Sequence, residues 1–141
     1  MAKITRQSPL APERFPDLPA VAGARFATLA AGLRYRDRDD LMLIEVAPGS
    51  TVAGVFTRST TAGHPVVWCR EILAGGEVRA VIVNAGNANV CRGAEGDAAV
   101  RAEARAVAAA LGCRPEQVFV ASTGVIGEPL PVDRIVGRVA D

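Results

Sequence analysis

The residues with the clearest chemical potential are Thr123 and Gly124, which follow the apolar run at residues 117–121. A hydroxyl and a neighbouring backbone N–H at the turn after a buried strand can both donate hydrogen bonds toward one point. Two such donors form an oxyanion hole, which stabilises the tetrahedral intermediate of acyl transfer. Glycine also lets a ligand approach the backbone closely. Because Thr-Gly turns are common, the spacing alone only suggests this chemistry.

Two other residue types often found in active sites are His64 and Cys91. His64 is the one histidine in the chain, and neither a Ser-x-Gly elbow nor a paired acid lies near it in the sequence. We therefore favour a loop imidazole preceding Pro65 over a catalytic base. An activated cysteine needs a cationic neighbour, and the position of Arg92 next to Cys91 in the sequence does not establish contact. We predict that Cys91 is a structural thiol.

Residues 84–89 (NAGNAN) are predicted to form a tight loop, since Asn and Gly tolerate left-handed backbone and Asn bonds its own backbone. This loop leads toward a helix N-terminus, where an anion could bind. The favoured interpretation is that the asparagine side chains only stabilise the turn. No Walker A motif occurs, and no G-x-G-x-x-G motif follows a strand, so no nucleotide cofactor is expected.

Composition excludes several classes of protein. The 141 residues correspond to about one domain, and 50% of them are apolar. Sixteen basic and fifteen acidic residues leave a net charge of +1, which favours neither nucleic acid nor an anionic membrane as a partner. No secretory signal or membrane-length apolar run occurs, and the three cysteines lack the CxxC spacing of a zinc site. We expect a cytoplasmic protein without a disulfide or a metal.

The elements that must position these residues are predicted from apolar patterns and turn signals. Residues 1–20 contain four prolines and should form an extended arm, followed by a single domain over residues 21–141. Strands are predicted at residues 25–33, 40–46, 51–57, 79–83 and 117–121, with the second and third paired as a hairpin around residues 47–50. The run at 79–83 is apolar throughout, which predicts a strand buried on both faces.

Helices are predicted at residues 65–73, 97–111 and 132–136. The second is the most regular, because Val100, Ala104, Val107 and Leu111 share one helical face. Asp97 suits its N-terminus and Gly112 its C-terminal end, while Pro131 opens the third helix. The predicted fold class is therefore mixed α/β.

Several motifs in a fixed order carry a resemblance to a known family. They are residues 30–35 (AAGLRY), 39–43 (DDLML), 53–57 (AGVFT), 83–93 (VNAGNANVCRG) and 121–127 (ASTGVIG). From about residue 20 to its end, the chain resembles the N-terminal part of the ArgJ family, the ornithine acetyltransferases or glutamate N-acetyltransferases. Each motif alone is weak, but their order over about 120 residues is specific.

The resemblance implies a layered α-β-β-α sandwich of the ArgJ/DmpA type. It also implies a precursor that cleaves itself before a threonine into α and β chains, which form an α2β2 heterotetramer. The new N-terminal threonine takes acetyl from N-acetylornithine and passes it to glutamate, and some members accept acetyl-CoA as donor. Its α-amino group can serve as the general base. Thr123 and Gly124 match the pair that supplies the family's oxyanion hole.

The chain departs from the family pattern at its end. Asp141 precedes the positions of the family's substrate lysine, cleavage junction and nucleophile, so we expect an incomplete α-chain part that is inactive alone. Substrate-binding residues therefore remain unassigned. Many relatives have lysine where this chain has Arg34, a mild change on a turn that does not alter the resemblance. Two alternatives stay open: a non-catalytic interaction domain of the same fold, and an aminopeptidase-like hydrolase in which water replaces glutamate.

Overall fold

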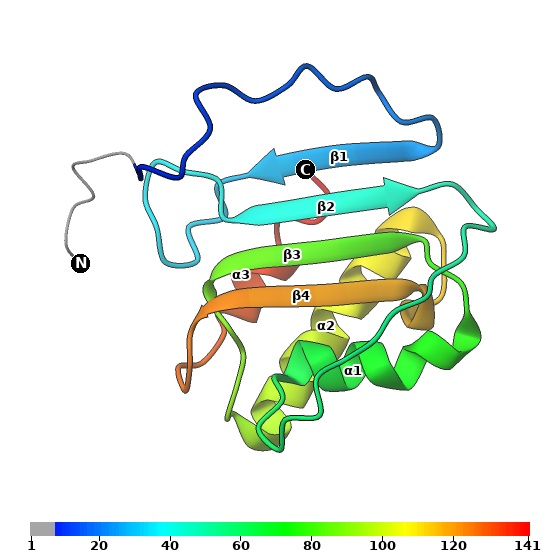
Figure 1. Ribbon diagram of the computed structural model, residues 1–141. Coiled ribbons are helices and arrows are strands. Elements are labelled where there is room, and N and C mark those ends of the chain that lie inside the picture. The colour runs from blue at the N-terminus through cyan, green and yellow to red at the C-terminus, as the bar shows by residue number, and fades with distance from the viewer. Residues whose placement is uncertain (1–7) are drawn as a thin grey trace.

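The computed structural model describes residues 8–141 and shows one sheet with helices on one of its faces (Figure 1). The strands are β1 (Ala24–Leu29), β2 (Leu41–Val46), β3 (Ala80–Asn87) and β4 (Val118–Val125). The helices are α1 (His64–Ile72), α2 (Gly93–Leu111) and α3 (Val132–Val136), with single 3-10 turns at Leu73–Gly75 and Pro115–Gln117. The mixed α/β fold class predicted from the sequence is confirmed.

The strands lie in the order β1-β2-β3-β4, which is also their order in the chain. β1, β2 and β3 pair antiparallel, whereas β3 and β4 pair parallel. A parallel pair needs a long crossover, and α2 provides it. The carboxyl ends of β3 and β4 therefore meet at the same edge of the sheet.

The core lies between the sheet and the helices. Ala80 and Ile82 of β3 face it, as do Val100 and Val107 of α2, and each is at most 1% exposed. α1 packs on the same side, where the indole N–H of Trp68 donates to the carbonyl of Val118 at 3.0 Å. Gly112 ends α2 in the left-handed conformation (φ 63°), as its sequence position predicted.

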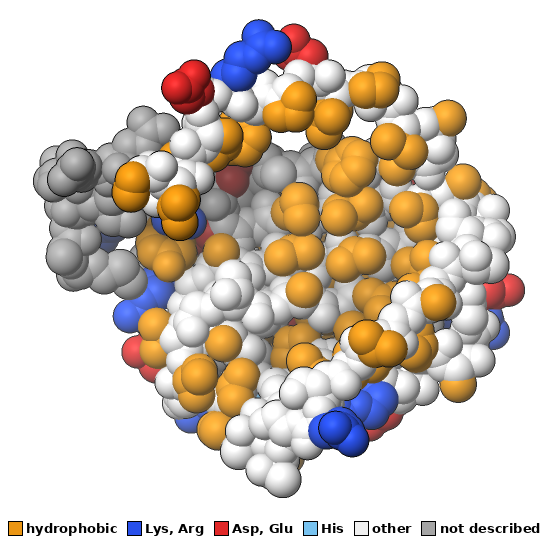
Figure 2. Space-filling model, viewed as in Figure 1, with side chains coloured by type: hydrophobic (Ala, Val, Ile, Leu, Met, Phe, Trp, Pro, Cys, Tyr) orange, Lys and Arg blue, Asp and Glu red, His pale blue; other side chains and the backbone are white. Residues whose placement is uncertain are grey.

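The opposite face of the sheet is mostly apolar and is open over β1, where Phe26 is 64% exposed, but Phe119 of β4 is buried. Cross-strand partners share a face, and the register sets two rows across this one: Phe26, Ile44, Val81 and Phe119, then Thr28, Met42, Val83 and Ala121. Figure 2 shows apolar side chains gathered over the sheet in a hollow. The prediction that residues 79–83 are buried on both faces is therefore wrong: β3 alternates between buried and half-buried residues.

Two of the predicted strands differ in the structure. The strand expected at 25–33 ends at Leu29, because the backbone N–H groups of Ala31 and Leu33 donate to the buried Asp40 carboxylate, each at 2.7 Å. Residues 51–57 do not form a strand. Only Thr51 makes a bridge, to Glu77, and the hairpin partner of β2 is β1 instead.

Two polar segments that were predicted as turns belong to strands. β3 continues through Asn87 and β4 through Val125, so most of the predicted loop at 84–89 and the whole predicted turn at 122–124 are extended. They are extended because each supplies the other's pairing partner. The second helix also begins four residues earlier than predicted, at Gly93 rather than Asp97.

The first and third helices agree with prediction to within one residue. α1 places Pro65 in its first turn, where the missing N–H is not needed. Pro131 precedes α3 directly. Of the predicted arm, residues 8–20 contain neither helix nor strand, and the bulky side chains Leu10, Phe15 and Leu18 are more than 80% exposed. Residues 1–7 lie outside the described part of the chain.

Candidate active site

Thr123 and Gly124 lie near the carboxyl end of β4, in parallel register with Ala85 and Gly86 of β3. Both are solvent-exposed, and Thr123 shares the open face of the sheet with Val83 and Ala121. The sequence placed the pair on a turn, whereas the structure places it within an edge strand. Both neighbours of Thr123 in the chain, Ser122 and Gly124, are also paired with β3.

Close packing of the two strands requires glycine at position 124. Its φ is 137°, in the region that favours glycine. A Cβ atom there would lie 2.2 Å from the carbonyl carbon of Gly86 and 2.4 Å from the backbone nitrogen of Asn87. Gly86 is equally constrained, with φ at 115° and 2.8 Å between an added Cβ and the Arg34 Cβ. Gly124 thus allows β4 to approach β3 closely beside Thr123, whereas Gly86 leaves room for the side chain of Arg34.

Backbone hydrogen bonds join the segment after β3 to the segment after β4. The N–H of Ala88 donates to the carbonyl of Val125 at 2.9 Å, and the N–H of Gly127 donates to the carbonyl of Val90 at 3.1 Å. Asn89 and Cys91 have left-handed backbone, with φ of 47° and 59°. The path of residues 88–92 is thus coupled to that of residues 125–127, which follow Thr123 and Gly124 directly.

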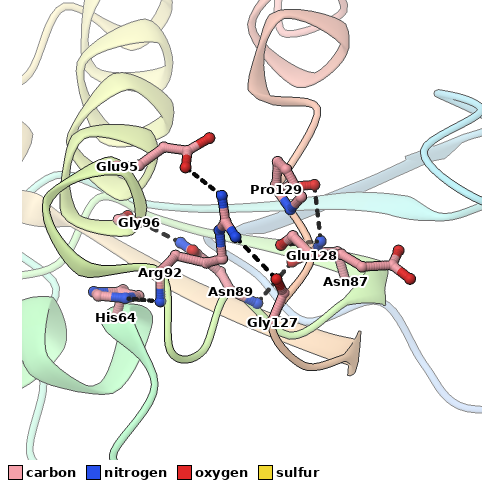
Figure 3. Close-up of polar contacts among 9 residues, drawn as sticks. All are labelled: His64, Asn87, Asn89, Arg92, Glu95, Gly96, Gly127, Glu128 and Pro129. Atoms are coloured by element: carbon pink, nitrogen blue, oxygen red, sulfur yellow. Dashed lines mark hydrogen bonds and ion pairs between the residues drawn. The ribbon is translucent and has the colours of Figure 1, made fainter.

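The asparagines of the 84–89 motif bond backbone groups (Figure 3). Asn87 Nδ2 donates to the carbonyls of Glu128 and Pro129 at 3.0 and 3.1 Å, while its Oδ1 accepts from the Asn89 N–H at 2.8 Å. Asn89 Nδ2 donates to the Gly96 carbonyl at 3.0 Å. These contacts agree with the favoured interpretation that the side chains stabilise the local backbone.

A further asparagine of the motif lies on β3, beside the edge strand β4. Asn84 is fully buried, and its Nδ2 donates to the carbonyl of Asn87 at 2.9 Å. Its strand partner is Ser122. Within residues 8–141, the Oδ1 of Asn84 and the Oγ of Ser122 have no hydrogen-bond partner. Polar groups buried in this way are typical of sites served by ordered water.

His64 is not an isolated loop imidazole. It begins α1, and its Nδ1 lies 2.7 Å from the Oδ1 of Asp97 on α2. Its Nε2 accepts a hydrogen bond from the N–H of Arg92 at 3.2 Å. Sequence analysis missed this pairing because 33 residues separate His64 from Asp97, and no local motif marks contacts between helices.

The cysteines are all free thiols. Cys91 is exposed, and the guanidinium of its neighbour Arg92 bonds instead to Glu95 and, at 2.9 Å, to the carbonyl of Gly127. Cys69 is buried behind β4, where its Sγ lies 3.3 Å from both the N–H and the carbonyl oxygen of Val120. Burial raises the pKa of the Cys69 thiol.

The described residues contain no group of three or more His, Cys, Asp and Glu side chains placed to hold a metal ion. No helix in residues 8–141 is both long and apolar enough to span a membrane.

The mixed sheet, its helical layer and its open face define a class, the α+β fold of the ornithine acetyltransferases. The chain superposes on ornithine acetyltransferase from Mycobacterium tuberculosis in complex with ornithine, with a TM-score of 0.81 and 43% identity, over 84% of this chain and 65% of that one. The ArgJ protein of Bacillus halodurans also gives 0.81, at 31% identity, over 85% and 63%. Residues 25–141 match the model of the ArgJ family, and the chain belongs to this family.

Curated relatives agree with this assignment. An "Arginine biosynthesis bifunctional protein ArgJ" from Gluconobacter oxydans is 53% identical over 99% of this chain and 32% of its own length. A protein of the same name from Bradyrhizobium diazoefficiens is 48% identical over 95% and 33%. The chain thus spans about a third of the length of these relatives.

Proposed function

We propose that this chain forms part of an enzyme that transfers acetyl from N-acetylornithine to glutamate through an acetyl-threonine intermediate. The chain's own contribution is the oxyanion hole, made by the hydroxyl of Thr123 and the N–H of Gly124. The observation that carries the proposal is the Thr-Gly pair itself, presented on an edge strand where Gly124 packs directly against the backbone of Gly86 and Asn87. The family assignment and the ornithine-bound relative support the choice of substrate.

In the proposed reaction, a threonine hydroxyl outside these residues attacks the acetyl carbonyl carbon, and its proton passes to the threonine's own α-amino group. The carbonyl oxygen gains negative charge as the tetrahedral intermediate forms. Thr123 and Gly124 donate to this oxygen, which strengthens binding in the transition state more than in the ground state. As the intermediate collapses, the α-ammonium group returns its proton to the departing nitrogen and ornithine is released. The amine of glutamate later attacks the carbonyl carbon of the acetyl-threonine.

The open face of the sheet supports a proposal about the rest of the enzyme. Phe26 is 64% exposed on this face, and the row of cross-strand partners that it begins is apolar from β1 to β4. Apolar surface of this extent marks an interaction site. We infer that a second sheet, in the β chain of the same precursor, covers it and completes the layered sandwich. Self-cleavage, an α2β2 heterotetramer, a cytoplasmic location and acetyl-CoA as an alternative donor are parts of the same proposal.

Substitution of Thr123 in the complete enzyme tests the proposal. Thr123→Ala should lower kcat about 10²–10³-fold, equivalent to ~2.7–4 kcal/mol, with little change in KM for N-acetylornithine. Thr60→Ala, which removes an exposed hydroxyl from the segment before α1, is the control and should leave kcat unchanged. Near-normal kcat in Thr123→Ala would mean that Thr123 only shapes the strand.

The reaction products separate the remaining alternatives. A transferase forms N-acetylglutamate in step with ornithine and depends on glutamate. An aminopeptidase-like hydrolase would release ornithine and acetate at the same rate without glutamate. A non-catalytic interaction domain would leave the complete protein without turnover.

A further inference from the structure

The imidazole of His64 joins three separate parts of the fold. The ring belongs to the first residue of α1, its Nδ1 contacts Asp97 of α2, and its Nε2 contacts the backbone of Arg92 in the loop after β3. Since the Arg92 N–H is a donor, Nε2 must be the unprotonated nitrogen. The proton then resides on Nδ1, which donates to the Asp97 carboxylate, as the hydrogen-bond pattern dictates.

The first turn of α2 is shaped to admit this ring. A Cβ atom on Gly96 would lie 2.2 Å from the Cδ2 and 2.4 Å from the Nε2 of His64. The φ of Gly96 is not in the left-handed region, so the backbone itself does not require glycine here. The absence of a side chain at Gly96 leaves room for the imidazole of His64, whose side chain is only 13% exposed.

The loop that His64 holds is bonded to the segment after Thr123 and Gly124. Besides the Arg92 contact, the N–H of His64 donates to the carbonyl of Asn89 at 3.0 Å. From the loop, the Arg92 side chain and the carbonyl of Val90 both bond to Gly127. Figure 3 shows His64, Arg92 and Gly127 in this order along one line of contacts.

We propose that His64 is a positioning residue for acetyl transfer. Its Nε2 fixes the Arg92 amide and, through residues 88–92 and 125–127, the orientation of Thr123 and Gly124 toward the acyl oxygen. The bond to Asp97 orients the ring and has no further role in the reaction. The inference rests on the proposed function, because it assigns to His64 an effect on the oxyanion hole.

Two substitutions separate the two bonds of the ring in the complete enzyme. The side-chain oxygen of glutamine reaches the Nε2 position, so His64→Gln keeps an acceptor for the Arg92 N–H. The amide nitrogen of asparagine takes the Nδ1 position, so His64→Asn keeps the donor to Asp97 but loses the acceptor. We expect His64→Asn to lower kcat about 10- to 100-fold with KM unchanged, and His64→Gln to retain most of the wild-type kcat. Equal kcat in the two variants would overturn the proposal.

Combination with Thr123→Ala tests whether His64 acts through the oxyanion hole. If it does, adding His64→Asn to Thr123→Ala leaves kcat at the value of Thr123→Ala alone, because coupled residues are non-additive. Independent, multiplied losses would overturn the inference while leaving the proposed function intact. Near-normal kcat in Thr123→Ala alone would instead overturn the oxyanion-hole assignment.

Gly96→Ala should displace the His64 ring without removing it. It tests the proposal independently if the His64 variants fail to fold. Alanine favours the helix at this position, so α2 should form normally, which far-UV circular dichroism can verify. We expect Gly96→Ala to lower kcat as His64→Asn does, and to have no further effect when His64 is already alanine. An equal loss of kcat from Gly96→Ala with and without the imidazole would contradict the proposal.

Discussion

Glu103 should make the free energy of unfolding of this chain fall as the pH rises. A carboxylate that is ion-paired in the folded state has the opposite effect. It lies on the buried side of α2 and is 0% exposed. Neither of its carboxylate oxygens has a hydrogen-bond partner within residues 8–141. Burial raises the pKa of Glu103 from 4.5 to about 8, because the ionised form loses its hydration without gaining a partner.

The sign of the effect follows from where the proton is bound. Between pH 4.5 and about 8 the folded chain keeps the Glu103 proton and the unfolded chain releases it, so the free energy of unfolding falls as the pH rises. At about 1.4 kcal/mol per pH unit, the fall amounts to about 5 kcal/mol across the window and about 3 kcal/mol by pH 7. These are upper limits, since water penetration and relaxation reduce the penalty.

Urea unfolding of the chain co-expressed with the remainder of the precursor, between pH 5 and 8.5 and followed by circular dichroism, measures this dependence. Glu103→Gln keeps the shape but cannot ionise, so the decline assigned to Glu103 should disappear. Glu103→Leu also removes the unpartnered polar group and should be the most stable variant at pH 7. Glu116→Gln, at an exposed position, is the control and should follow the wild-type profile. If Glu103→Gln lost stability with rising pH as steeply as the wild type, the assignment to Glu103 would be refuted.

Three further predictions concern the site and the open face. Cys91→Ala should leave acetyl transfer within several-fold of the parent, because the guanidinium of the adjacent Arg92 bonds to Glu95 and Gly127. Complete loss of activity in a folded variant would favour a thiol mechanism. Gly124→Ala should lower both kcat and the urea midpoint, since the added Cβ would overlap Gly86, and an unchanged midpoint would contradict this packing argument. Residues 1–141 expressed alone should be poorly soluble and release no ornithine. Co-expression with the remainder of the precursor should restore glutamate-dependent release of ornithine. Turnover by residues 1–141 alone would place the nucleophile within them.

Local sequence determined the elements whose signals lie within a few residues. The helix from His64 to Ile72, the end of α2 at Gly112 and the helix after Pro131 all follow from proline, glycine and helical periodicity, which act on neighbouring backbone. β2 was likewise predicted within one residue of its observed bounds. The Thr-Gly pair and the family motifs were also readable from the sequence, because residue identity and order carry them.

Tertiary pairing decided the rest. Residues 84–87 and 122–125 have the composition of turns, yet they are extended because each segment satisfies the other's backbone hydrogen bonds across a parallel pair. Residues 51–57 have the composition of a strand but are not one, since β1 and β3 already occupy both edges of β2. The contact of His64 with Asp97 and the burial of Glu103 likewise depend on how the helices pack. Such partners lie tens of residues apart, and a local pattern contains no information about which distant group will meet it.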